Sequence, residues 1–92
     1  MDRRKSEAIA LEALGWLAAD PDLVGAFLAE AGTGPEALRA RAREPEFLGF
    51  VLDFLLAEDA RVIAFCGAAG LPFDALMRAR GALPGGESVH WT

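Results

Sequence analysis

Hydrophobic residues recur at steps of three and four along most of the chain, which is the spacing typical of an amphipathic helix. No stretch alternates strictly between apolar and polar residues, as a strand with one buried face does. The pattern therefore predicts an all-α fold. We expect about six short helices, near residues 6–19, 21–31, 35–43, 45–56, 59–69 and 72–82.

Prolines and glycines stand where these helices should begin and end. A proline suits the first helical turn, because its missing N–H has no partner to lose there. The carboxylate of Asp20 is placed to accept from the free amides of the helix that follows it. Gly32 and Gly70 follow two of the apolar stripes, where a left-handed residue closes a helix at no steric cost. Four prolines directly precede stripes: Pro21, Pro35, Pro45 and Pro72.

The chain also carries an internal repeat. Residues 13–38 align with residues 51–76 without a gap, and ten of the 26 positions are identical. A unit of this size rarely folds alone, so two three-helix units should share one core in a pseudo-two-fold bundle. Similar helix-turn-helix sequences without duplication would give a comparable alignment, and the sequence leaves this alternative open. We expect one domain over 1–83, with units near 6–43 and 44–82, and an irregular tail over 84–92.

The composition leaves few groups for chemistry. One cysteine and one histidine exclude an intrachain disulfide and a metal site built from Cys or His ligands alone. The 92 residues include no Asn, Gln or Tyr, and the formal charge is −5. Cys66 lies on an apolar stripe, so we expect a buried small hydrophobe rather than a reactive thiol. We therefore expect no enzymatic activity and no cofactor.

The N-terminal segment only partly resembles a secretory signal. A basic start precedes an apolar run, but Glu7 and Glu12 interrupt that run, and Asp20 stands where a small-residue cleavage site should be. No uncharged run approaches the roughly 20 residues that a membrane-spanning helix needs. An unpaired cysteine fits a reducing compartment. We expect a cytoplasmic protein that does not engage a membrane.

The second repeat unit is more hydrophobic than the first at several aligned positions. A position that accepts a charge in one unit is expected at the surface there. Phe50, Phe73 and Met77 are therefore candidates for an exposed apolar patch that binds a partner. Asymmetric packing or a returning tail would instead cover them, and Phe50 also fits a core stripe. The aligned pairs are Phe50 with Glu12, Ile63 with Gly25, Phe73 with Pro35 and Met77 with Arg39.

Trp91 is the most informative residue of the tail, because a large aromatic side chain is costly to leave in water. It is expected to fold back onto the bundle or to anchor the tail in a partner, and a mobile tail is the third alternative. His90 beside it is expected to be solvated. We include Trp91 with Phe50, Phe73 and Met77 among the candidate partner-binding residues.

Arginines cluster at Arg39–Arg43 and Arg78–Arg80, which suggests nucleic-acid binding as one alternative function. The acidic balance argues against it, and so does the spacing, because arginines two apart point to nearly opposite sides of a helix. Both clusters fall near predicted helix C-termini, where cations stabilise the free carbonyl groups. Nucleic acid is therefore the less favoured partner.

The chain resembles a family of small uncharacterised helical proteins of alphaproteobacteria, catalogued as a domain of unknown function. The resemblance spans residues 6–92 and is most specific in the segments ALGWLA and FLLAEDA. It implies one compact helical domain and brings no functional residue. From the residues, we favour a non-enzymatic module for protein interaction or regulation that binds another protein, with a homodimer also open. A carrier of a small apolar ligand, held between the two units, is a further alternative.

Overall fold

Six α-helices and one 3₁₀ turn form the fold, which a computed structural model describes for residues 1–84. No strand occurs in these residues, so the predicted all-α class is confirmed. Within the same residues, every helix is too short or too polar to span a lipid bilayer. The elements are α1 (Arg3–Ala18), α2 (Pro21–Ala31), η1 (Pro35–Ala37), α3 (Leu38–Arg41), α4 (Pro45–Leu56), α5 (Asp59–Ala69) and α6 (Ala75–Gly81).

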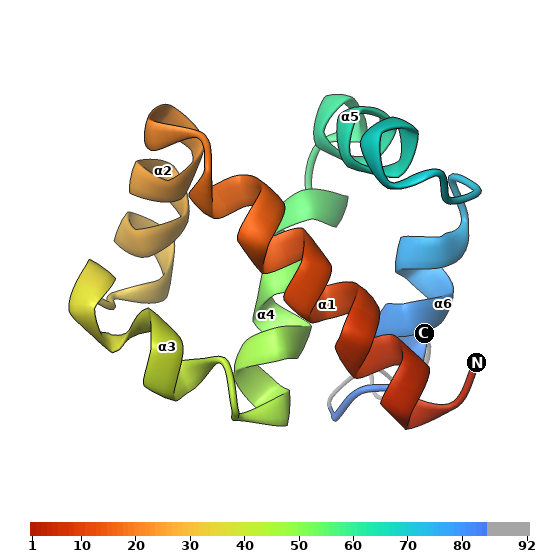
Figure 1. The fold of residues 1–92 in the computed structure, drawn as a ribbon, viewed down its shortest axis with the longest axis horizontal. Coiled ribbons are helices and arrows are strands. Elements are labelled where there is room, and N and C mark those ends of the chain that lie inside the picture. Colours follow the sequence, from red (N-terminus) through yellow and green to blue (C-terminus); the bar gives the residue numbers. More distant parts are fainter. Residues whose placement is uncertain (85–92) are drawn as a thin grey trace.

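Helices α1, α4 and α6 pack against one another and enclose most of the core. In Figure 1, α1 crosses α4 near the centre of the molecule, with α2 and α3 on one side and α5 and α6 on the other. α2 packs against α1 and α4, whereas α5 packs against α4. Large side chains that are fully or almost fully buried include Leu17, Phe27, Leu52, Leu55, Phe65 and Leu76.

Phe27 joins α2 to this core. It is the one side chain of α2 that is fully buried. Its ring lies edge-on to Phe47, Phe50 and Phe54 of α4, with centroid separations between 5.2 and 5.6 Å. Aromatic pairs in this arrangement stabilise a fold by about 0.5–1.5 kcal/mol beyond the burial of their area.

Side-chain caps explain where two of the helices start. Asp20 accepts from the amides of Asp22 and Leu23 at 3.0 and 3.2 Å, which confirms the predicted cap of α2. α1 begins at Arg3, three residues earlier than predicted, because Asp2 accepts from the amide of Lys5 at 2.7 Å. This cap was not identified from the sequence, because residue 2 precedes the apolar stripe from which the first helix was predicted.

The predicted helices 35–43 and 72–82 are shorter in the structure. The first begins as a 3₁₀ turn and ends at Arg41, and Glu44 is already extended (φ −93°, ψ 120°). Pro45 accounts for this end, because a proline disfavours helical backbone in the residue before it. The second begins only at Ala75, whose amide closes a turn on the carbonyl of Pro72 at 3.0 Å.

The two repeat units share their helix ends and part of their core. Gly32 and Gly70 close α2 and α5 with left-handed φ values of 64° and 70°, as predicted. Phe27 and Phe65 are aligned in the repeat, and both are buried. The third segments differ, because α6 packs against α1 and α4 whereas the main contacts of α3 are with η1. The pseudo-two-fold relation stays a prediction.

Truncation of Phe27 tests how far the fold depends on this side chain. We expect Phe27→Ala to lower the free energy of unfolding by about 3–5 kcal/mol, because it removes a buried ring and leaves a cavity. Urea denaturation followed by circular dichroism measures the change. Leu11→Ala is the matched control, since Leu11 is 47% exposed and its loss should cost about 0.5 kcal/mol or less. Equal effects of the two substitutions would contradict this role.

Candidate interaction groove

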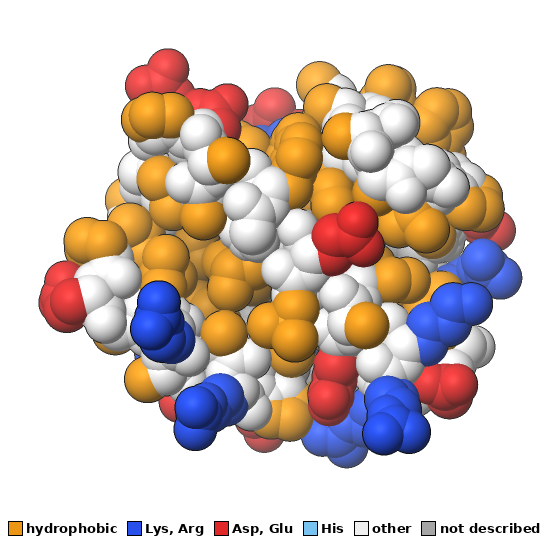
Figure 2. All heavy atoms as spheres, viewed as in Figure 1, with side chains coloured by type: hydrophobic (Ala, Val, Ile, Leu, Met, Phe, Trp, Pro, Cys, Tyr) orange, Lys and Arg blue, Asp and Glu red, His pale blue; other side chains and the backbone are white. Residues whose placement is uncertain are grey.

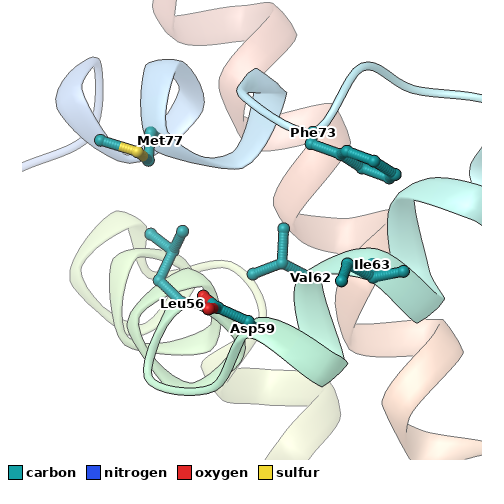
Figure 3. A pocket seen from close by; sticks show the side chains of 6 residues that line it. All are labelled: Leu56, Asp59, Val62, Ile63, Phe73 and Met77. Carbon is teal, nitrogen blue, oxygen red and sulfur yellow. The ribbon is translucent and has the colours of Figure 1, made fainter.

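An apolar groove opens between the end of α4, helix α5 and the start of α6, with a volume of about 350 Å³. We call it the α5–α6 groove. Figure 3 shows Leu56 and Val62 pointing toward α6, which carries Met77, while Phe73 lies above Ile63. Its walls are formed by Leu56, Asp59, Val62, Ile63, Phe73 and Met77.

Large hydrophobic side chains at the surface are concentrated in this groove. Across residues 1–84, five large hydrophobic side chains are exposed, and three of them line the groove. Ile63, Phe73 and Met77 are 54%, 60% and 67% exposed, whereas the other two, Met1 and Leu11, do not line it. Isolated apolar residues are normal on a protein surface, but a contiguous apolar patch is typical of an interaction site.

The helical period of α6 places Met77 outside the core. Ala75, Leu76 and Ala79 turn inward and are buried against α1 and α4, so Met77 must lie on the opposite face. Phe73 stands in the turn before α6, where no helix can carry it into the core. Met77 is therefore exposed because the opposite face of α6 is buried, and Phe73 is exposed because it lies in the turn before the helix. Both side chains line the groove.

The groove carries one negative charge on its wall. Asp59, in the first turn of α5, forms no ion pair or side-chain hydrogen bond within the described residues. Its neighbour Glu58 pairs with Arg61 at 3.4 Å, and Asp74 pairs with Arg78 at 3.7 Å. The carboxylate of Asp59 is therefore available to a ligand that brings a cation or an N–H donor to an otherwise apolar surface.

The structure brings together two of the four predicted partner-binding residues. Phe73 and Met77 share the groove, whereas Phe50 is half-buried on α4 against Phe27 and does not line it. The core-stripe alternative for Phe50 is the one that the packing supports. Trp91 lies outside the described residues. Ile63 was not selected from the sequence, although its alignment with Gly25 was a usable signal.

Three arginines make packing contacts within the fold: Arg41, Arg61 and Arg80. The guanidinium carbon of Arg61 lies 3.9 Å from the ring centroid of Phe54, and its Nη1 donates to the Phe54 carbonyl at 2.8 Å. That of Arg41 lies 4.6 Å from the ring centroid of Phe47. Figure 2 shows the Lys and Arg side chains of this face spread from its left side along the lower and right-hand edges, with acidic side chains between some of them. This arrangement does not favour a nucleic-acid surface.

Arg80 joins α6 to α4 and to the chain that follows. Its Nε and Nη2 donate to the two carboxylate oxygens of Asp53 at 2.7 and 3.2 Å, and its Nη1 donates to the Pro84 carbonyl at 3.0 Å. Gly49 leaves room for this side chain, because a Cβ there would lie 2.8 Å from Nη1. A bidentate arginine–carboxylate pair of this kind is stronger than a single ion pair.

A family described as a protein of unknown function, DUF3572, matches residues 3–86 of the chain. The chain belongs to the DUF3572 family. The expected membership of a family of unknown function is thereby confirmed, and the match covers all six helices. No curated protein and no solved structure matches the chain.

This DUF3572 chain offers little catalytic chemistry in the part that the structure describes. Cys66 is fully buried, and burial raises the pKa of its thiol, with a further contribution from the negative charge of Asp74. A buried thiol with a raised pKa is a poor nucleophile. Among residues 1–84, no three His, Cys, Asp or Glu side chains gather where they could hold a metal ion.

Titration of Cys66 provides a test of its burial. The unfolded chain releases the thiol proton at a lower pH than the folded chain, so ionisation favours unfolding. This contribution to stability is present below the ordinary pKa of 9.0 and is lost as the pH rises through the raised value. We expect urea denaturation at a series of pH values to show that, above pH 9.0, the free energy of unfolding falls more steeply for the wild type than for Cys66→Ala. Parallel pH profiles would contradict the assignment.

Proposed function

We propose that this DUF3572 protein is a non-enzymatic interaction module of the cytoplasm, whose α5–α6 groove holds an amphipathic helix of a partner protein. One observation carries the proposal: Ile63, Phe73 and Met77 are exposed large hydrophobic side chains that line a single groove. Leaving such a patch in water is unfavourable, and a partner helix that covers it gains the corresponding free energy.

The shape and charge of the groove indicate the chemistry of the partner. Apolar side chains spaced at three and four residues along a helix would fit between α5 and α6, as in other helix-in-groove complexes. A lysine or arginine on the same helix would face Asp59, which has no ion pair within the described residues. Burying this carboxylate without a counter-charge would cost free energy, so the groove selects basic over acidic helices.

The other functions fit these observations less well. Three of the nine basic residues, Arg41, Arg61 and Arg80, are engaged in packing contacts and are less available to phosphates. A small-ligand carrier was expected to hold its ligand between the two repeat units, whereas the α5–α6 groove is formed by residues of the second unit alone. Three of its six wall residues are also strongly exposed, which suits an anchoring side chain better than an enclosed ligand.

A displayed library of amphipathic helices tests the proposal directly. We expect the selected helices to carry apolar residues at helical spacing together with Lys or Arg. Met77→Glu should weaken their binding by about tenfold or more, since it places a second charge in the apolar wall. Isothermal titration calorimetry measures the affinities, and Leu11→Glu is the control because Leu11 lies outside the groove.

Two results would contradict the partner-helix proposal. Selected helices whose affinity is unchanged by Met77→Glu bind elsewhere on the surface. A concentration-dependent dimer in sedimentation experiments that Met77→Glu dissociates would assign the groove to a second copy of the chain.

A further inference from the structure

The chain that follows α6 is tied to two of the helices that carry the α5–α6 groove. Asp53 and Leu56 lie one helical turn apart on α4, and Arg80 and Met77 lie one turn apart on α6. Leu56 and Met77 line the groove, whereas Asp53 and Arg80 form the bidentate pair on the same two helices. Arg80 also holds the Pro84 carbonyl at 3.0 Å. Pro84, the last described residue, is therefore held by an arginine that lies one helical turn after Met77 on α6.

The eight residues after Pro84 are long enough to enter the groove. Their sequence is GGESVHWT, and an extended chain of this length spans about 26 Å. Trp91 is the seventh of these residues, and seven extended residues span about 23 Å, whereas the whole of α6, with seven residues, is about 10 Å long. The segment is therefore long enough to run back along α6 to the groove.

We propose that Trp91 occupies the α5–α6 groove of its own chain when no partner is bound. The apolar indole ring matches the wall formed by Ile63, Phe73 and Met77, and its N–H is a donor for the carboxylate of Asp59. The covalent connection favours this occupant, because a short connection gives an effective concentration on the order of millimolar. A partner helix must then displace Trp91, so the tail lowers the apparent affinity of the groove for a partner helix. This inference depends on the groove and goes beyond the proposed function.

Tryptophan fluorescence of the full chain tests this placement without a partner. The chain has two tryptophans, and Trp16→Phe leaves Trp91 as the only emitter. We expect a blue-shifted emission maximum and acrylamide quenching about twofold or more weaker than in the urea-unfolded chain, because the groove shields the ring. Adding Met77→Glu or Phe73→Ser should shift the emission to that of the unfolded chain. Leu11→Glu should leave it unchanged, and circular dichroism verifies that each variant is folded.

Each alternative result overturns the proposal. Emission that already matches the unfolded chain shows that Trp91 is solvated. A blue shift that survives both Met77→Glu and Phe73→Ser places the ring outside the groove, and one that disappears on dilution places it in the groove of another copy. These outcomes are separate from a failure of the proposed function. Helices selected on the protein would still bind in a Met77-dependent manner if Trp91 were solvated.

Discussion

Burial of one face of α6 against α1 and α4 is the constraint on which the candidate site depends. Ala75, Leu76 and Ala79 fill the space between the two long helices, and the small alanines allow α6 to approach closely. With that face committed to the core, the period of the helix leaves Met77 to solvent, beside Phe73. The apolar groove is thus a direct consequence of how the core is closed, and it needs no strained backbone.

The packing of α6 against α1 and α4 also positions the charged side chains around the groove. Arg80 reaches back from α6 to Asp53 and holds the carbonyl of Pro84, so the pair fixes both the helix and the point at which the chain leaves it. The guanidinium group of Arg61 lies over the ring of Phe54 and forms an ion pair with Glu58. Asp59, one residue further along, has no ion pair within the described residues. The neighbouring residues Glu58 and Asp59 therefore differ in role. Glu58 is paired with Arg61, whereas Asp59 lines the groove.

Membership of the DUF3572 family brings no assigned activity, so the function rests on the physical character of the surface. Within residues 1–84 the one cysteine is buried, and Arg41 and Arg61 lie over aromatic rings of α4. The exposed apolar groove with a single carboxylate on its wall is the surface feature on which the proposed function rests. Recognition by apolar contact, oriented by one charge, is the chemistry that it supports.

The sequence by itself determined the helices and their boundaries near Asp20, Gly32 and Gly70, because capping and left-handed closure depend on residues that are adjacent in the chain. It also pointed to Phe73 and Met77, through the comparison of the two repeat units. It could not separate these from Phe50, whose exposure depends on Phe27 arriving from another helix. Only the tertiary structure decided which apolar residues form the groove, because the packing of α6 on α1 and α4 involves residues far apart in the sequence.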